Sequence, residues 1–190
     1  MDRLEMKEKL SKKLPAKRFE HSLGVEYTAS CLAMVHGADV EKALIAGLLH
    51  DCAKWLGSTE KIEKCKKHGL MVSEVERNNP ELLHAKLGAH YAKTKYGISD
   101  DEILSAITYH TTGRPNMSLL DKIIFVADYI EPNRRPLPEI EEIRKEAFAD
   151  IDKCIIHILK NTLSFLDNSS SDMTDKMTID TYNYYVNNAK

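Results

Sequence analysis

The sequence predicts an all-α protein with a single domain. Apolar residues recur at helical spacing along almost the whole chain, and no segment shows the strict alternation of a convincing strand. The 190 residues, 43% hydrophobic and 29% charged, suit one globular domain with a sizeable core. No repeat with a period of about 20–50 residues indicates a solenoid. We therefore expect a helical bundle.

The expected helices follow one another with short connections. In chain order they cover residues 4–14, 17–36, 39–54, 58–68, 73–79, 84–96, 99–111, 118–131, 139–147, 150–167 and 178–188. Glycines and prolines supply stops, which in chain order are Pro15, Gly37, Gly69, Pro80, Gly97, Pro115 and Pro132. Ser73 with Glu76 and Ser99 with Glu102 match the capping box that begins a helix.

Two stretches interrupt the helical pattern. The prolines of "EPNRRPLPE", residues 131–139, should hold that segment extended, and "DNSSSDMTDK", residues 167–176, reads as a polar loop. We expect one domain over residues 1–167, with a polar linker and a C-terminal helix over residues 168–190. Ile179, Val186 and the neighbouring tyrosines suggest that this last helix docks on the same chain or on another one.

Charge and composition restrict the partners to small molecules. A formal net charge of -2 gives no basic field for nucleic acid, and the longest apolar runs are far shorter than the ~20 residues of a membrane span. The four cysteines form no CxxC pair, and no charged-then-apolar leader opens the chain. We expect a cytoplasmic protein that binds a nucleotide, without nucleic-acid or membrane partners, and we leave both a monomer and a homodimer open.

A histidine and an aspartate stand side by side in the apolar segment "KALIAGLLHDCAKW". Leu48 and Leu49 precede them and leave little room for a polar face, so His50 and Asp51 should be buried or line a cleft. A buried carboxylate is costly unless it is paired, and a metal cation is its strongest partner. A lone His-Asp pair is more often an ordinary hydrogen-bonded pair, so further ligands must support a metal site.

Further histidines and a second aspartate stand in similar apolar helical surroundings. They are His21 in "RFEHSLGV", His84 in "LLHAKLGAHYA", His110 in "AITYHTTGR" and Asp128 in "IIFVADYIEP". Side chains from separate helices can converge in the centre of a bundle to form a metal site, here between the central helices. Imidazole and carboxylate without thiolate suit iron, manganese or zinc. The other histidines, His36, His68, His90 and His157, are not assigned to the site.

The order of these residues resembles the H…HD…H…H…D pattern of the HD-domain metal-dependent phosphohydrolases. The flanking residues resemble one branch still more closely, the bacterial symmetrical diadenosine tetraphosphate hydrolases known as YqeK. The motifs are "HSLGV", "LLHDCAK", "LLHAKLGA", "YHTTGR" and "ADYIEPNR". The resemblance covers about residues 17–135, and five ordered motifs are far more specific than one His-Asp pair.

The resemblance implies a fold, a set of metal ligands and a reaction. His21, His50, Asp51 and Asp128 would hold one metal, and Asp51 would bridge to a second metal held by His84 and His110. One or two divalent or trivalent ions are expected, most commonly iron, with manganese or zinc as alternatives. A metal-activated hydroxide would attack a phosphate and cleave diadenosine tetraphosphate symmetrically to two ADP.

Four polar residues near the motifs are expected to bind the substrate. Lys54 lies one helical turn beyond Asp51, and Arg114 follows His110 through a turn at Gly113; both are also expected to assist catalysis with Asp51. Asn133 and Arg134 follow Pro132 and should lie beside the metals.

Two alternatives to this function stay open. The first is another HD-type phosphohydrolase, a mononucleotide phosphatase or a dNTP hydrolase, since the family shares its metal site across different substrates. The second is a metal-dependent nucleotide sensor that turns over no substrate. A panel of substrates distinguishes the first alternative, and tight nucleotide binding without product would indicate the second.

Overall fold

The structure is a computed structural model that describes residues 1–134, 137–167 and 174–189. Its regular elements are α1 (Arg3–Ser11), α2 (Ala16–His36), α3 (Val40–Leu49), α4 (Ser58–Lys67), α5 (Glu74–Asn78), the 3-10 turn η1 (Pro80–Leu82), α6 (Leu83–Tyr96), α7 (Asp101–Tyr109), α8 (Leu119–Ile130), α9 (Ile140–Ala149), α10 (Ile151–Asp167) and α11 (Lys176–Asn188). No strand occurs in these described ranges. The predicted all-α single-domain class is confirmed.

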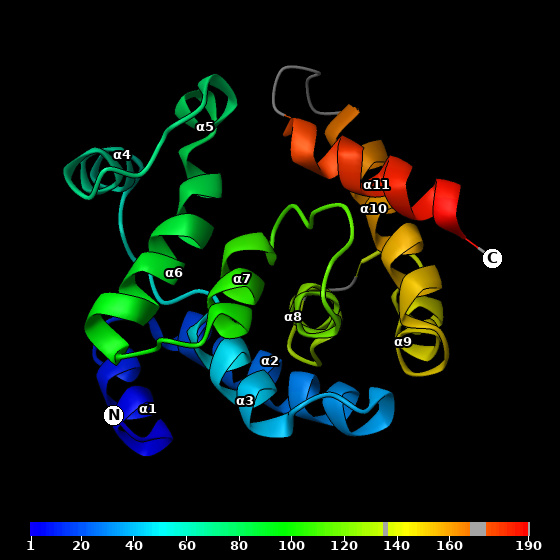
Figure 1. The fold of residues 1–190 in the computed structure, drawn as a ribbon, viewed down its shortest axis with the longest axis horizontal. Helices are drawn as coiled ribbons and strands as arrows, with labels where there is room; N and C mark the ends of the chain where they lie inside the picture. The colour runs from blue at the N-terminus through cyan, green and yellow to red at the C-terminus, as the bar shows by residue number, and fades with distance from the viewer. Residues whose placement is uncertain (135–136, 168–173, 190) are drawn as a thin grey trace.

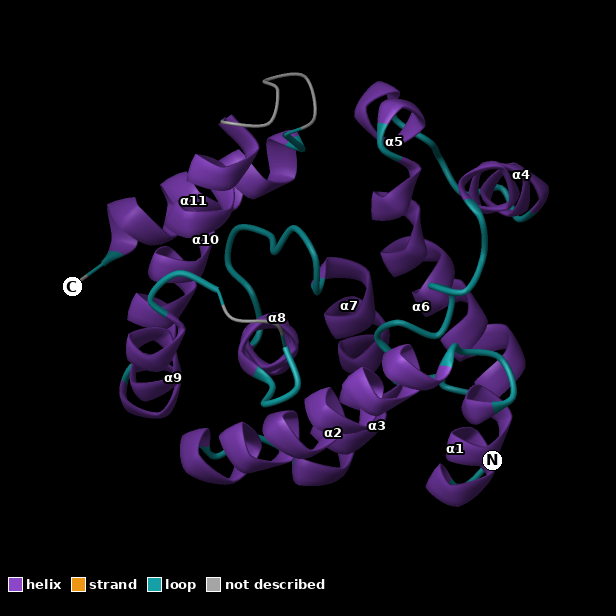
Figure 2. Cartoon of the chain, turned by 180° about the vertical axis from the view of Figure 1, so that it is seen from behind, coloured by secondary structure: helices purple, strands orange, loops and turns teal. Residues whose placement is uncertain are grey.

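Helix α8 runs through the middle of the bundle (Figure 1). It packs against α2 and α3 on one side, α7 on another and α10 on a third, while α6 covers α7 and α11 covers α10. Figure 2 shows the same arrangement from behind, with α9, α10 and α11 grouped on one side of α8 and α4, α5 and α6 on the other. Ile123, Ile124 and Val126 of α8 are fully buried, as expected of a helix that is apolar on nearly every face.

Helix α3 comes very close to the backbone of α2 at Gly47, where the two helices cross. A Cβ atom at this position would lie 2.9 Å from Glu26 Cα and 3.0 Å from the Val25 carbonyl oxygen. Only a residue without a side chain permits that contact. The glycine therefore sets how closely α3, which leads into the His-Asp pair, approaches α2.

The predicted helix over residues 39–54 is too long. Helix α3 ends at Leu49, His50 is its C-cap, and residues 50–55 continue as tight turns. In a longer helix the Gly47 carbonyl would accept from the backbone N–H of Asp51, four residues on. Here it accepts from His50 Nδ1 at 2.7 Å. Backbone bonds from Cys52 to Leu49 and from Lys54 to Asp51 close the turns instead.

One of the two predicted capping boxes is present. The Ser73 hydroxyl accepts from the Glu76 backbone N–H, and the Glu76 carboxylate accepts from the Ser73 backbone N–H, so this box is confirmed. The box predicted from Ser99 is wrong, because the N-cap of α7 is Asp100, which accepts from the N–H groups of Glu102 and Ile103. The carboxylate one residue further along therefore begins the helix.

The C-terminal helix α11 lies against α10 of the same chain (Figure 1). Tyr185 is buried, and so are Thr178 and Thr181. Ile179 and Val186, which the sequence suggested as docking residues, are instead 41% and 42% exposed. Much of the predicted linker, residues 168–173, lies outside the described residues. Within the part of the chain that is described, no helix is both long and apolar enough to span a membrane.

Candidate metal centre

Six polar side chains from five parts of the fold meet in the centre of the bundle. They are His21 on α2, His50 and Asp51 directly after α3, His84 on α6, His110 directly after α7 and Asp128 on α8. All but Asp128, whose side chain is 20% exposed, are buried. Three overlapping groups within this set each have their ligand atoms within 4.8 Å of one another.

Asp51 lies between two groups of histidines. Its Oδ2 atom is 3.5 Å from His50 Nε2 and 4.0 Å from His21 Nε2. Its Oδ1 atom is 3.1 Å from His84 Nε2 and 3.8 Å from His110 Nε2. Each carboxylate oxygen thus faces a different pair of imidazoles, which is the geometry that a bridging ligand requires.

Asp128 belongs to the first of these two groups. Its Oδ1 atom lies 2.9 Å from His21 Nε2 and 3.8 Å from His50 Nε2. The first group therefore offers two imidazoles and two carboxylates. The second offers two imidazoles and the other oxygen of Asp51.

All four imidazoles turn the same nitrogen toward the centre. Three of them place Nδ1 against the backbone carbonyl three residues earlier: His50 at Gly47 and His110 at Ile107, both at 2.7 Å, and His84 at Glu81. A carbonyl only accepts, so Nδ1 carries the proton and the lone pair of a neutral ring is on Nε2. The fourth imidazole, His21, places Nδ1 2.9 Å from Glu131 Oε1.

The charge states of His110 and Asp51 suit metal ligands. Burial, reinforced by nearby His50 and His84, lowers the pKa of His110 to about 3, so this imidazole is neutral. Burial opposes the charge on Asp51, but the adjacent His50 and His84 outweigh it and hold the pKa of Asp51 well below its usual value. Neutral imidazoles and an ionised carboxylate are the forms that bind metal.

The buried nitrogens provide a direct test of whether a metal fits. His21 Nε2 and His50 Nε2 are shielded from solvent and have no hydrogen-bond partner of acceptable geometry. Buried polar atoms without a partner are rare and costly. A cation between these nitrogens and the two carboxylates would satisfy all of them, so the residues present fit a metal.

Two residues beside the cluster were not predicted from the sequence. Arg18 donates from Nη1 to Asp51 Oδ2 at 2.9 Å, and Glu131, which is fully buried, holds His21. Arg18 comes three residues before His21 on the same helix face, and Glu131 stands inside the quoted "ADYIEPNR" motif. The spacing of Arg18 from His21 and the place of Glu131 in the motif are visible in the sequence. Without the spatial contacts, however, neither feature distinguishes these residues from their neighbours.

Glu131 is accommodated by a glycine on α2. A Cβ atom at Gly24 would lie 2.3 Å from Glu131 Oε2 and 3.1 Å from Glu131 Cδ. Glu131 Oε2 also accepts from the Asn133 backbone N–H at 2.8 Å. The carboxylate is therefore held from both sides in the position where it contacts His21.

Three of the four predicted substrate-binding residues lie at or near the cluster. Lys54 Nζ is 3.2 Å from His84 Nδ1, and Arg134 donates to Asp128 Oδ1 at 3.0 Å. Asn133 and Arg134 line a hollow of about 890 Å³ that reaches His21 and is also lined by Lys17 and Arg18. This mouth of the metal centre is rich in cations.

Arg114 is placed differently. Its Nε and Nη2 atoms donate to Asp121 Oδ2 at 3.0 and 2.8 Å, and its guanidinium lies 5.1 Å from the centre of the Tyr109 ring. No hydrogen bond or ion pair between described residues joins Arg114 to the six clustered side chains. The turn at Gly113, with φ of 64°, is present as expected.

The four unassigned histidines lie elsewhere. His36 contacts the Ala147 carbonyl at 2.7 Å, His68 and His90 stack with ring centres 4.2 Å apart, and His157 lies between Glu139 and Glu146. The structure places none of them in the cluster.

Comparison with known proteins shows which chains share this arrangement. The family described as HD domain matches residues 18–133. "Bis(5'-nucleosyl)-tetraphosphatase, symmetrical" of Bacillus subtilis (strain 168) is 41% identical, with 98% of each chain covered. The protein of the same name from Halalkalibacterium halodurans is 46% identical over 78% of this chain and 79% of the other.

A solved structure extends the likeness to three dimensions. A predicted HD superfamily hydrolase involved in NAD metabolism from Clostridium acetobutylicum superposes with a TM-score of 0.94 at 42% identity. The superposition covers 98% of each chain. Similarity therefore extends through α9, α10 and α11, which lie beyond the matched HD domain.

Proposed function

This chain belongs to the HD-domain family, and on that basis we propose that it is a hydrolase that cleaves diadenosine tetraphosphate symmetrically to two ADP. The observation that carries the proposal is the cluster in which Asp51 faces two pairs of imidazoles through its two oxygens. Full-length relatives named as symmetrical bis(5'-nucleosyl)-tetraphosphatases supply the choice of substrate.

We propose that His21, His50, Asp51 and Asp128 hold one metal, and that Asp51, His84 and His110 hold a second. A metal pair held in this way lowers the pKa of a coordinated water and neutralises phosphate charge. The donor set of nitrogen and oxygen without sulfur suits iron, manganese or zinc alike, and the resemblance to the HD-domain phosphohydrolases is what favours iron. Elemental analysis of protein purified from cells tests the identity of the metal.

The surrounding cations are suited to a polyphosphate. Arg18 and Arg134 pair with the two carboxylates of the cluster, and Lys54 lies beside His84. We propose that these side chains bind phosphate oxygens and stabilise the charge that builds on them during reaction. Asn133, on the wall of the same hollow, binds the substrate, and Arg114, which pairs with Asp121, assists catalysis.

The reaction adds one water across the central phosphoric anhydride. The oxygen of water bonds to one of the two inner phosphorus atoms, and the bond from that phosphorus to the bridging oxygen breaks. One ADP carries the new oxygen and the other leaves with the bridging oxygen. ADP is a good leaving group, so no dedicated general acid is required.

Product analysis tests the proposal. Metal-analysed protein is mixed with diadenosine tetraphosphate and the products are separated by chromatography; we expect ADP alone. AMP with ATP would show attack at a different phosphate. Absence of turnover, with metal fully loaded, would contradict the proposal, and a panel of mononucleotides would then distinguish another phosphohydrolase from a nucleotide sensor.

The Asp51→Ala variant provides the matched control for this experiment. Because Asp51 contacts both pairs of imidazoles, its loss should remove both metals together with the activity. Full activity with a normal metal content in Asp51→Ala would contradict the assignment of the site.

We also propose that the protein acts in the cytoplasm. All four of its cysteines are free, and three of them are buried. Reduced thiols are typical of the cytosol, where disulfides are rare. Fractionation of cells that express a tagged chain tests this location.

A further inference from the structure

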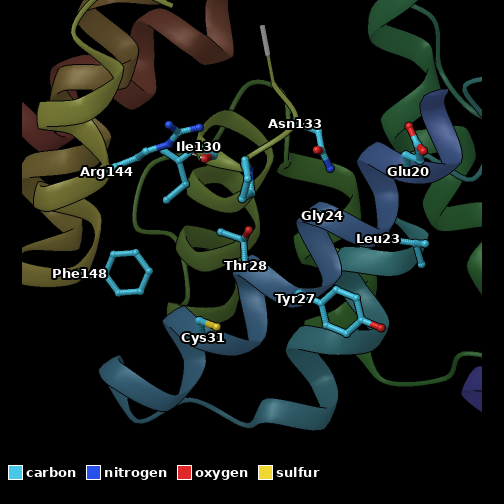
Figure 3. A pocket seen from close by; sticks show the side chains of 11 residues that line it. Glu20, Leu23, Gly24, Tyr27, Thr28, Cys31, Ile130, Asn133, Arg144 and Phe148 are labelled. Atoms are coloured by element: carbon cyan, nitrogen blue, oxygen red, sulfur yellow. Dashed lines mark hydrogen bonds between the residues drawn. The ribbon is translucent and has the colours of Figure 1, made fainter. Parts of the chain in front are cut away.

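We propose that a cleft between α2 and α9 binds one nucleoside of the substrate, with the purine base against its apolar wall. This inference rests on the proposed function, because it assigns the place of one adenosine once the phosphates lie at the metal centre. The cleft has a volume of about 660 Å³, which is within the usual range for small-molecule sites. Figure 3 shows the residues around it.

One face of α2 forms the floor of the cleft. Leu23, Tyr27, Thr28 and Cys31 all come from that helix, the last three following Leu23 by four, five and eight residues, so they share one side of it. The end of α8 and the helix α9 provide the opposite wall, from which Phe148 reaches toward the cleft (Figure 3).

The lining suits the flat, apolar faces of a purine. Phe148 is 44% exposed and Tyr27 is 54% exposed, so both rings are accessible to a ligand. Lys7 lies over the Tyr27 ring, 5.1 Å from its centre, and so occupies part of that ring. Phe148 is therefore the aromatic face to which we assign base stacking.

The cleft continues into the mouth of the metal centre. Glu20 and Asn133 line both the cleft and the 890 Å³ hollow that reaches His21. The chemistry along α2 then changes in the order of a nucleotide: Arg18 beside Asp51, Glu20 at the junction, and the apolar cleft at Thr28. Cations suit phosphates, an acidic residue accepts from ribose hydroxyls, and apolar side chains suit a base.

The length of this path agrees with the same ligand. Ten residues separate Arg18 from Thr28, which at 1.5 Å per residue is about 15 Å along the helix axis. That distance spans an extended nucleoside diphosphate. The hollow and the cleft are thus the right distance apart to hold the phosphates and the base of one half of the substrate.

The wall opposite α2 is held in place before any ligand arrives. Arg144 of α9 donates from Nε to the Ile130 carbonyl at 3.0 Å and from Nη2 to the Glu131 carbonyl at 3.3 Å. These bonds tie α9 to the end of α8, beside the residue that contacts His21. A preformed wall lowers the ordering cost of binding.

Cys31 gives a direct measurement of occupancy. It is the exposed cysteine of this chain, whereas Cys52, Cys65 and Cys154 are buried, and it lies on the cleft floor. The metal-loaded protein is labelled with N-ethylmaleimide, alone or with saturating ADP or pyrophosphate. We expect ADP to slow labelling of Cys31 at least about fivefold and pyrophosphate to leave the rate unchanged. Equal protection by both, or by neither, would overturn the inference.

A pair of matched variants tests the base contact during turnover. Phe148→Ala should raise the KM for diadenosine tetraphosphate about tenfold, since base stacking on an aromatic side chain has this order of effect, with kcat and metal content retained. Phe165→Ala, the same change at a 64% exposed position on α10, should leave KM unchanged. An unchanged KM in Phe148→Ala would overturn the inference.

The two proposals fail in different ways. If ADP protects Cys31 but diadenosine tetraphosphate is not cleaved, the nucleoside site stands and the proposed function is wrong. If the substrate is cleaved to ADP while Cys31 is unprotected and Phe148→Ala behaves as the wild type, the function stands and the cleft is not the nucleoside site.

Discussion

The orientation of each imidazole at the metal centre is set by a hydrogen bond on its outer nitrogen. Backbone carbonyls hold His50, His84 and His110, while Glu131 holds His21. Partners of this kind fix the tautomer and aim of a metal-binding histidine. The orientation of His21 is the easiest of the four to disturb by mutation, because its partner is a side chain 110 residues away and not a nearby backbone carbonyl.

The Glu131→Gln variant tests this dependence. Glu131 accepts from both His21 and the Asn133 backbone through its two oxygens, and an amide has only one oxygen to offer. We expect metal affinity or activity to fall about 10–100-fold with the helical circular dichroism signal retained. Glu142→Gln, an exposed carboxylate on α9, is the control. Wild-type metal affinity and activity in Glu131→Gln would contradict the proposed role.

His157 should make stability depend on pH. Its hydrogen bond to Glu139, with a second to Glu146, raises its pKa above the unfolded value of about 6.5. The resulting stabilisation is complete below that unfolded value and is lost as the pH rises through the higher folded value. Urea unfolding should therefore show His157→Gln less stable than the wild type near about pH 5.5, with the gap closing by about pH 9. A gap that does not vary with pH would exclude this account.

At the scale of elements, α2 determines how the site is approached. It presents Arg18 and His21 to the cluster, Gly24 to Glu131 and Glu26 to the crossing with α3. Glu26 is itself buried and paired with Arg3 and Lys7 of α1. The packing of α3 on α2 therefore fixes the distance between His21 and the His-Asp pair that follows α3.

The Gly47→Ala variant tests that packing. Alanine favours a helix interior by about 1 kcal/mol over glycine, so propensity alone predicts a more stable protein. We expect the reverse, a loss of about 1–3 kcal/mol in the free energy of unfolding, because the new methyl group meets the α2 backbone. Gly57→Ala, where the nearest atom is 3.6 Å away, makes no such contact and should cost at most about 1 kcal/mol, because Gly57 is the N-cap of α4. Stabilisation by Gly47→Ala would show that the helices separate easily.

At the scale of the whole molecule, the cluster joins five separate parts of the fold. A cation that binds there would bind the folded chain and not the unfolded one, so it should raise the stability of the entire domain. The two carboxylates and the buried unpaired nitrogens that would bind the cation come together only in the folded chain, so metal binding and folding are coupled.

Removal of metal should therefore lower the melting temperature. At a free metal concentration 100 times Kd the stabilisation is about 2.7 kcal/mol, which for a chain of this size is a shift of about 5–10 °C. Calorimetry of the metal-loaded and chelator-treated protein measures the shift. Asp51→Asn, which lacks the bridging charge, should melt at the same temperature in both conditions. Equal melting temperatures for the wild type would exclude a structural contribution from the metal.

Sequence patterns were enough to predict the helical class, the approximate position of each helix and the six clustered residues. These follow from local properties, namely apolar periodicity, the residues at helix ends, and a spaced set of motifs that resembles a known family. The bounds of α4, α5 and α6 differ from expectation by one residue and those of α1 and α7 by up to three, because turn and cap residues lie close to the helices they end.

Which residues contact the cluster, and how the His-Asp pair is presented, became clear from the packing of the helices. Arg18 contacts Asp51 across 33 residues and Glu131 contacts His21 across 110, and no local pattern encodes such pairs. The end of α3 at Leu49, the pairing of Arg114 with Asp121 and the cleft beside α2 likewise depend on how helices pack. Periodicity states which face of a helix is buried, whereas the partner of each buried group is set by the packing of the whole chain.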